Sequence, residues 1–510
     1  DIRDTRFNFN PGVEETYEFL ETLLGETAQA YESKYFNINC DETEGLGNGK
    51  AKSYVDSLGS ENAYCQHINK VYDILQKYDK DVMMWGDILA KNPEMIKQLP
   101  EDIQFIVWSY GGRDSFDEMI APFKNSGHTF WIAPGASCWA SSFPYIDNYI
   151  KNIAHFNRDG YKNGAKGVIN TAWDDYGETM FNSTWHAMVW CAETSWNTLK
   201  TNDEVERIER ENIFNKNFEI QYFETVSNQQ SAISNQLSVN TGIIPTPQFA
   251  EICDFNNSTN NFVIDESCLL VDIGENEEIS KIINTFKNDI KEITGVDLKV
   301  SKKGNKKRNN IVFGIYDPEK IEQIKNGPKD IIGLDSREIN PQEYHIIVIG
   351  NYIMVSAPTP QGLFYGAQSL KQLIRHQLLT ENNLNIPWYY IFDYPSLEYR
   401  GWMDDISRGP IPTTDFIKEQ IRRLAEYKFN FFNLYTEHLF KLDEYPDIAP
   451  TDGLTAEEIQ ELTEYAKDYY IEFIGNQQCF AHAEKTLDNP FYDDIRDTRF
   501  NFNPGVEETY

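Results

Sequence analysis

The chain has 510 residues, more than one ordinary domain, and its 40% hydrophobic content is enough for a large core. Its 80 Asp and Glu against 46 Lys and Arg give a net charge of −34, which excludes the basic field that nucleic acid or an anionic membrane requires. No apolar run is long enough to span a bilayer. Seven cysteines lack the spacing of a zinc site or disulfide framework, so we expect neither a metal nor a cofactor.

The two ends of the chain carry the same sequence. Residues 1–17, DIRDTRFNFNPGVEETY, recur unchanged at 494–510. A solenoid would show several diverged copies, so the match indicates a circularly permuted chain, or one cut from a tandem or circularised gene. The first copy runs into a helix predicted over Val13–Lys34, whereas the second ends after about one helical turn, too short to persist alone. We therefore expect the first copy to dock and the second to fray or swap with another molecule.

Short apolar runs alternate with amphipathic segments over residues 1–200. The amphipathic segments, such as 63–77, have helical periodicity, and strand, helix, strand at this spacing is typical of a parallel sheet. The five strands predicted here are Tyr35–Cys40, Asp81–Trp85, Gln104–Trp108, Thr129–Ala133 and Gly167–Trp173.

A change of pattern separates this region from a second domain. Residues 201–240 are polar and rich in Asn, which predicts a helical tail and linker with a boundary near Ser238. Residues 241–393 have the pattern of a small α+β accessory domain. Its one basic run, Lys302–Arg308, is broken by Gly and Asn and favours a solvated hairpin loop. The predicted elements are strands 269–273 and 311–315, a hairpin of 344–349 and 352–356, and helices 279–293 and 361–376.

Alternating strands and helices return over residues 394–493. Three strands are predicted, Arg400–Ile406, Asn430–Tyr435 and Tyr470–Gly475, each followed by a helical pattern. Together with the five earlier strands they make eight, the number that closes a (β/α)8 TIM barrel. This α/β barrel must be assembled from both ends of the chain, with strands 1–3 from residues 394–493 and strands 4–8 from residues 1–200. The terminal repeat independently suggests the same closure.

The first strand of the chain ends in two acids, Asp41 and Glu42, within KYFNINCDETE. A buried strand that delivers carboxyl groups at its C-terminal end is where a (β/α)8 barrel carries its chemistry. A helix cap or a surface acid pair is the alternative. Glu42 is the better proton donor, because the charge of Asp41 and a partly dry site would both raise its pKa, and Asp41 then stays ionised.

Seven motifs in a fixed order connect the chain to a known family. They are TGIIPTPQ (241–248), GLFYGAQSLKQLI (362–374), YRGWMDDISRGPIP (399–412), GNQQCFAHAEK (475–485), INCDE (38–42), VMMWGDI (82–88) and VINTAWDDYGE (168–178). Read from residue 243 through the C-terminus and back to about residue 200, this order resembles the family 20 glycoside hydrolases, the β-N-acetylhexosaminidases. No single motif is specific, but the ordered set is.

The resemblance implies a retaining exo-β-N-acetylhexosaminidase that releases terminal GlcNAc or GalNAc from β-linked glycans, and it suggests export from the cell. In substrate-assisted hydrolysis the sugar's own 2-acetamido oxygen attacks the anomeric carbon, so no enzyme nucleophile is needed. Glu42 would then protonate the leaving oxygen. Asp41 would hold the acetamido N–H and stabilise the oxazolinium ring as it forms.

The resemblance also implies several substrate-binding residues. Arg408 would grip sugar hydroxyls, with a surface salt bridge as the alternative, and Asp175 in WDDYGE would bind substrate. His482 and Glu437 would form a pair that tunes Glu42, although a capping or exposed role is the alternative for Glu437.

Four tryptophans complete the expected site. An acetamido methyl group fits a tight apolar site and a pyranose ring fits an aromatic surface, so tryptophans gathered at one barrel face favour sugar binding. Ordinary barrel packing is the alternative for each of them. Those at or near predicted strand ends are Trp85, Trp108 and Trp173, and Trp139 follows another strand.

The chain departs from the family pattern at two places. Asn37, Asn39 and Cys40 replace the usual His and Gly-Gly around the acid pair, and APGASCW (133–139) replaces the usual Tyr-x-Asp. The hydroxyl that orients the acetamido group is therefore unassigned. Two other hypotheses stay open: a sugar-binding protein that has lost catalysis, and an incomplete reading of a tandem gene that is active only when neighbouring copies complete the barrel.

Overall fold

The computed structural model describes residues 2–5, 7–139, 141–199, 241–252, 261–272, 276–316 and 339–487, together with the strands β18 (Arg496–Thr498) and β19 (Asn501–Phe502). The chain divides into two compact units. The first holds residues 1–191, 397–424 and those from 429 onward, and the second holds residues 192–396 and 425–428. The predicted linker over 201–240 lies outside the described residues.

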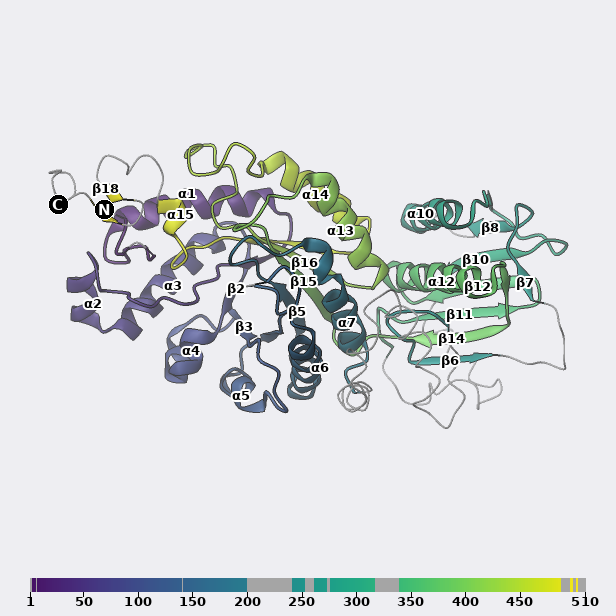
Figure 1. The fold of residues 1–510 in the computed structure, drawn as a ribbon, viewed down its shortest axis with the longest axis horizontal. Helices are drawn as coiled ribbons and strands as arrows, with labels where there is room; N and C mark the ends of the chain where they lie inside the picture. Colours follow the sequence, from purple (N-terminus) through teal and green to yellow (C-terminus); the bar gives the residue numbers. More distant parts are fainter. Residues whose placement is uncertain are drawn as a thin grey trace. The chain divides into compact units, whose positions relative to one another are not determined.

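The first unit is a closed barrel of eight parallel strands, as predicted. Going round it, the strands from the late part of the chain come first and lead directly into the strands from the early part (Figure 1). The closure pairs β17 with β1, with Phe36 opposite Gly475. In that order the strands are β15 (Tyr399–Asp405), β16 (Phe431–Tyr435), β17 (Glu472–Asn476), β1 (Tyr35–Asn37), β2 (Asp81–Trp85), β3 (Gln104–Trp108), β4 (Phe130–Ala133) and β5 (Gly167–Ala172).

The strand bounds lie within three residues of the predicted ones. β4, β5 and β16 are buried along their whole length, as expected for parallel strands covered on both faces. The largest difference is at β1, which ends at Asn37 and not at Cys40. Asn39 and Cys40 have positive φ angles of 59° and 63°, a left-handed conformation that cannot continue a strand.

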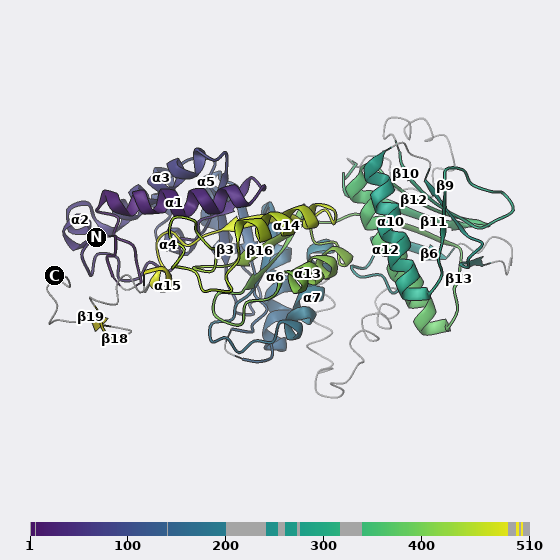
Figure 2. The ribbon, with the colours of Figure 1, turned by 90° about the horizontal axis from the view of Figure 1, so that it is seen from above.

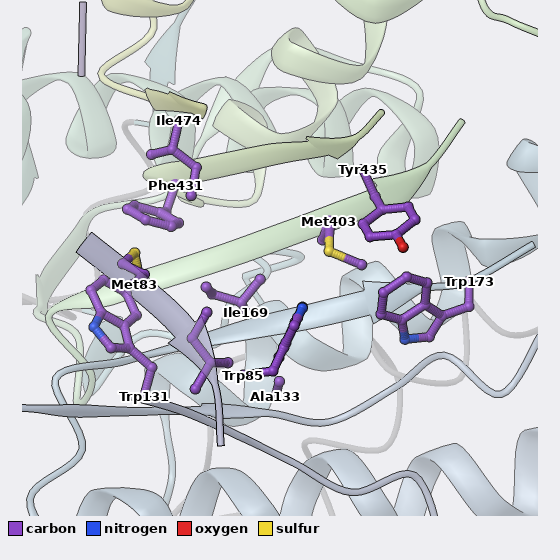
Figure 3. Close-up of a cluster of buried hydrophobic side chains, with 11 residues drawn as sticks. Met83, Trp85, Trp131, Ala133, Ile169, Trp173, Met403, Phe431, Tyr435 and Ile474 are labelled. Atoms are coloured by element: carbon purple, nitrogen blue, oxygen red, sulfur yellow. The ribbon is translucent and has the colours of Figure 1, made fainter. Parts of the chain in front are cut away.

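The barrel interior is filled by side chains, and aromatic rings dominate it. Trp131 and Phe431 lie together at one end of this cluster, with ring centroids 4.9 Å apart (Figure 3). Trp173 and Tyr435 meet edge to face at the other end, 4.7 Å apart. The second end is the one nearest the C-terminal ends of the strands, where the site lies.

Helical structure follows each barrel strand, and an additional helix, α1, precedes β1. Helix α1 packs against α3 and α14, so a helix from the head of the chain lies beside one from its tail (Figure 2). The bounds are α1 (Glu14–Ala30), α2 (Lys52–Leu58), α3 (Ser60–Gln76), α4 (Asp87–Lys91), η1 (Pro93–Gln98), α5 (Asp117–Ser126), α6 (Ile146–Asn163), η2 (Phe181–Thr184), α7 (Trp185–Trp196), α13 (Thr414–Glu426), α14 (Ala456–Lys467) and α15 (Glu484–Leu487).

Residues 2–5 and 7–9 form a short antiparallel turn that packs on the barrel, and we call them the head segment. Arg3 pairs with Phe9, and the Phe9 N–H donates to the Phe480 carbonyl at 3.0 Å. Phe9 is fully buried. In the second copy, Arg496 pairs with Phe502 in the same register. The side chains of that copy lie outside the described residues, so its expected fraying stays a prediction.

The second unit is a mixed sheet in the order β6-β14-β11-β12-β10-β8-β9, with α10 and α12 packed on its strands. The predicted hairpin is present as β11 and β12, turned at Gly350 and Asn351. The basic run is an exposed loop, but not a hairpin, because the strands on either side of it, β9 and β10, both pair with β8. The bounds are β6 (Phe249–Ile252), β7 (Phe262–Val263), β8 (Leu269–Asp272), α10 (Glu277–Thr294), β9 (Lys299–Ser301), β10 (Asn310–Ile315), β11 (Tyr344–Ile349), β12 (Tyr352–Ala357), α12 (Pro360–Glu381), β13 (Asn385–Ile386) and β14 (Tyr389–Asp393).

None of the described helices combines the length and apolar character needed to cross a bilayer.

Candidate active site

The two predicted acids sit on a short loop, residues 38–42, directly after β1. We call it the acid loop. Asn39, Cys40 and Glu42 all adopt positive φ there, Glu42 with φ 48°. Residues with a Cβ rarely adopt this conformation, and it persists where surrounding contacts impose it. The acid loop is therefore held in shape by its neighbours.

Those neighbours are the strands on either side of β1. Trp85 at the end of β2 makes two hydrogen bonds to Asn39, from its backbone N–H at 3.0 Å and from its indole Nε1 at 2.9 Å. On the other side, the Asn39 amide donates to Asn476 Oδ1 at 3.0 Å. The Tyr64 hydroxyl donates to the Cys40 carbonyl at 2.8 Å. The loop is thus fastened to both flanking strands.

His482 joins the two acids. Its Nε2 lies 3.3 Å from Glu42 Oε2 and 3.6 Å from Asp41 Oδ2. Burial of His482 opposes its positive charge, but the hydrogen bonds to Asp41 and Glu42 outweigh burial and raise the pKa of His482 to about 10. The Phe7 ring of the head segment packs edge-on against the imidazole at 4.6 Å. Among the described residues, these three side chains also form the group whose donor atoms, all within 4.8 Å of one another, are close enough to hold a metal ion.

The expected rise in the Glu42 pKa is wrong. The hydrogen bond from His482 lowers the pKa of Glu42; partial burial acts the other way, and the charge of His482 lowers the pKa further. The Glu42 side chain is 48% exposed, so the dry site assumed from the sequence is absent around it. Glu42 is therefore a carboxylate in the free protein, in contact with a histidine cation.

A second charged cluster surrounds Arg408. One guanidinium nitrogen, Nη1, lies 2.8 Å from Asp405 Oδ2 and 3.0 Å from Asp175 Oδ1. The guanidinium also lies over the rings of Trp173 and Tyr435, with its carbon 5.6 and 5.3 Å from their centroids. Arg408 is thus mostly buried and fixed from several sides. Its positive charge also lowers the pKa of Glu42, so the two clusters interact electrostatically.

Glu437 belongs to the Arg408 cluster and not to the His482 pair that the resemblance implies. Its carboxylate lies 3.4 Å from Arg408 Nη2 and 3.6 Å from Lys485 Nζ. Glu437 is 3% exposed, and burial raises its pKa although both cations act the other way. The expected partner of His482 is replaced by the acids themselves, Asp41 and Glu42, which occupy its Nε2.

The four predicted tryptophans fall into two classes. Trp85, 1% exposed, and Trp173, 9% exposed, belong to the barrel core. Trp108 and Trp139 are only partly buried and pack at its edge. Tyr110, which the sequence interpretation missed, lies between them, stacked on Trp108 at 5.1 Å and tilted against Trp139 at 5.3 Å.

Tyr110 fills space that a short residue on the neighbouring strand end leaves open. A Cβ on Gly135 would lie only 2.6 Å from the Tyr110 ring. The Tyr110 hydroxyl oxygen accepts a hydrogen bond from Trp173 Nε1 at 2.7 Å. The charges of Asp41 and Glu42 contribute to raising the Tyr110 pKa, although burial is the main cause. Two features of the sequence could have indicated Tyr110: APGASCW lacks the family's tyrosine, and a tyrosine follows β3.

Two family models match the chain. The model described as "Glycosyl hydrolase family 20, catalytic domain" matches residues 1–139, and "Glycosyl hydrolase family 20, domain 2" matches residues 240–394. Together they cover more than half of the chain.

The chain belongs to glycosyl hydrolase family 20.

Among relatives of this family 20 chain, "Beta-hexosaminidase" of Porphyromonas gingivalis is 27% identical over 189 residues, which are 33% of this chain and 24% of that protein. "Beta-hexosaminidase subunit A1" of Dictyostelium discoideum is 29% identical over 151 residues, 28% of each protein. The chain thus spans about a quarter of the length of the curated relatives it matches.

Solved structures of the family are also similar in part. The β-N-acetylhexosaminidase from Bacteroides fragilis is 20% identical with a TM-score of 0.38, covering 52% of this chain and 51% of that one. The family 20 β-N-acetylhexosaminidase from Streptomyces coelicolor is 20% identical with a TM-score of 0.35, covering 46% and 45%.

Proposed function

We propose that this chain is a retaining exo-β-N-acetylhexosaminidase that removes terminal GlcNAc or GalNAc from β-linked glycans by substrate-assisted catalysis. The observation that carries the proposal is the contact of Asp41, Glu42 and His482 at the C-terminal end of the barrel, within electrostatic reach of Arg408. Membership of family 20 and the relatives named as β-hexosaminidases support it.

The proton for the leaving oxygen starts on His482. This residue is a cation at neutral pH, because its pKa is about 10, and its Nε2 lies 3.3 Å from Glu42 Oε2. A sugar that displaces water from Glu42 disfavours the charged carboxylate, so the proton moves from His482 to Glu42. Glu42 gives this proton to the glycosidic oxygen as the acetamido oxygen attacks the anomeric carbon and the bond to the leaving group breaks. Water then opens the oxazolinium ring, with Glu42 taking its proton.

Asp41 holds the acetamido group during this attack. It is 7% exposed, and its Oδ1 is buried with no hydrogen-bond partner among the described residues. A buried acceptor oxygen in this state suits the acetamido N–H. Tyr110 is the hydroxyl that we assign to orienting the acetamido oxygen, because its ring occupies the space beside Gly135 where the family's tyrosine is missing.

Arg408 and Asp175 bind sugar hydroxyls in this proposal. Asp175 Oδ1 accepts from Arg408 at 3.0 Å, yet the Asp175 side chain is 45% exposed, so it has room for a second partner. Trp108 and Trp139, partly buried at the same end of the barrel, offer apolar surface for the sugar ring.

We further propose that the domain order is circularly permuted relative to the family. The support is that β17 pairs with β1 and that the catalytic-domain match precedes the domain 2 match in this chain.

The test of the activity is hydrolysis of aryl β-N-acetylglucosaminides by the wild type, Glu42→Gln and Glu44→Gln. Glu44 is the matched control, a nearby exposed acid that pairs with Lys91 at 3.2 Å. Loss of the acid should lower kcat/KM by about 10²- to 10⁴-fold with a poor leaving group. Glu44→Gln should stay within about twofold, as surface substitutions usually do. Equal rates for wild type and Glu42→Gln would exclude the proposal, and sugar binding without turnover would identify a sugar-binding protein.

A further inference from the structure

Asp87, directly after β2, touches the acid loop but belongs to no role described so far. Its Oδ2 accepts a hydrogen bond from the backbone N–H of Glu42 at 3.2 Å. Its Oδ1 is buried with no hydrogen-bond partner among the described residues. Asp87 is the first residue of the short helix α4, yet its carboxylate is used across the strand ends and not on its own helix.

The Glu42 backbone needs such an anchor. Its φ of 48° is a conformation that a residue with a Cβ adopts rarely, and the neighbouring Asn39 and Cys40 share the difficulty. Asn39 is held by Trp85, as described above. The hydrogen bond to Asp87 is the corresponding anchor for Glu42, from the same strand end.

The position of Asp87 disfavours its ionised form. Burial raises the pKa of Asp87 to about 7, and the charge of Asp41 raises it too, whereas the hydrogen bond from Glu42 and the charge of Lys91 lower it. Placing a third carboxyl group beside Asp41 and Glu42 opposes its own ionisation.

We propose that Asp87 is a positioning residue for the acid: by accepting the Glu42 N–H it fixes the left-handed turn that directs the Glu42 carboxyl group to His482 and to the leaving oxygen. This inference rests on the proposed function, because it concerns the proton donor of that reaction. Because Asp87 acts through Glu42, its loss should slow hydrolysis most for substrates whose leaving group must be protonated.

The experiment compares two substrates that differ only in the leaving group. A 2,4-dinitrophenyl β-N-acetylglucosaminide leaves without acid assistance, whereas a methyl or phenyl glycoside needs it. Asp87→Ala should lower kcat/KM at least about tenfold for the poor leaving group and less than about threefold for the good one. Asp87→Asn, whose amide oxygen can accept the same N–H, should restore most of the loss.

Asp159→Ala is the matched control. Asp159 is a buried acid of the same barrel whose Oδ2 accepts the backbone N–H of Phe116 at 2.8 Å, away from the acid loop. It should lower the melting temperature and leave the ratio of the two substrate rates unchanged. Equal losses on both substrates in Asp87→Ala, or an Asp87→Asn variant as impaired as Asp87→Ala, would overturn the inference. If the wild type cleaves neither substrate, the proposed function fails first and this inference with it.

Discussion

At the residue scale, each cluster of the site places a cation among carboxyl groups that would otherwise repel one another. Asp41 and Glu42 are adjacent carboxylates, and His482 lies between them as a cation. Arg408 plays the same part for the second cluster, where its guanidinium contacts Asp175, Asp405 and Glu437. Each cation contacts at least one acid from another strand end: Asp41 and Glu42 for His482, and Asp175 and Glu437 for Arg408. Each position therefore depends on the closed barrel. In the proposed mechanism, the first cluster would supply a proton beside the acid and the second a fixed donor for sugar hydroxyls.

The charge on His482 makes stability depend on pH. Its pKa is raised to about 10 in the folded chain from an ordinary value of 6.5, so its contribution is complete below pH 6.5 and lost as pH rises through about 10. Wild type should therefore lose about 1.4 kcal/mol of unfolding free energy per pH unit in this window from this group, and His482→Gln should not. Urea unfolding at several pH values measures the difference. If the unfolding free energies of wild type and His482→Gln change in parallel from pH 7 to 10, the raised pKa of His482 is contradicted.

The sequence predicted most of these residues but not their partners. Asp41, Glu42, Arg408 and His482 were found from motifs at strand ends. The direction of the Glu42 pKa shift was missed because the prediction rested on the adjacent acid and a partly dry site, whereas a direct hydrogen bond from His482, 440 positions away along the chain, decides it. Motifs identify residue types at strand ends, whereas pKa values depend on contacts between strands.

At the element scale, apolar runs predicted the barrel strands, while the loop conformations after them depend on contacts between elements. Asn39, one of the left-handed residues of the acid loop, is held by Trp85 and Asn476, which no local pattern reveals. The Tyr110 placement is similar, because a side chain after β3 uses space left by Gly135 after β4. The conformation after one barrel strand therefore depends on residues at the end of the neighbouring strand.

Gly135→Ala tests this pairing. Its Cβ would lie 2.6 Å from the Tyr110 ring, which is confined by Trp108 and Trp139 and has little room to move. We expect a loss of about 1–3 kcal/mol in stability, as for other overpacked sites, and a lower kcat/KM for aryl N-acetylglucosaminides. Gly111→Ala is the control, since its Cβ would meet nothing within 4 Å. Thermal unfolding and steady-state kinetics of both variants measure these losses. If Gly135→Ala is no more impaired than Gly111→Ala, the placement of Tyr110 beside Gly135 is contradicted.

At the scale of the whole molecule, the barrel is closed by joining the two ends of the chain. The sequence predicted this from the count of strands and from the repeated 17 residues, and the pairing of β17 with β1 agrees. The head segment adds to the joint. It hydrogen-bonds to Phe480 and Ala483 near His482, and Asn8 donates to the Glu44 carbonyl after the acid loop. Closure and active-site geometry therefore depend on the same few residues.

Asp4 is the strongest single anchor of the head segment. Its carboxylate accepts backbone N–H groups from Gly47 at 2.7 Å, Gly49 at 3.1 Å and Ala51 at 2.7 Å. Removing it leaves three donors without their charged acceptor, so Asp4→Ala should destabilise the barrel by on the order of 3 kcal/mol. Asp497, the same residue in the second copy, provides a matched control within the chain.

The pair of variants distinguishes one docking copy from two exchangeable copies. If only the head segment serves the barrel, Asp4→Ala lowers the unfolding free energy, Asp497→Ala leaves it unchanged, and the double variant equals Asp4→Ala, because distant independent sites add. If the second copy can replace the first, each single variant is mild and the double variant loses far more than the sum. Denaturant unfolding of the three variants at low protein concentration, which suppresses exchange between molecules, measures which case holds.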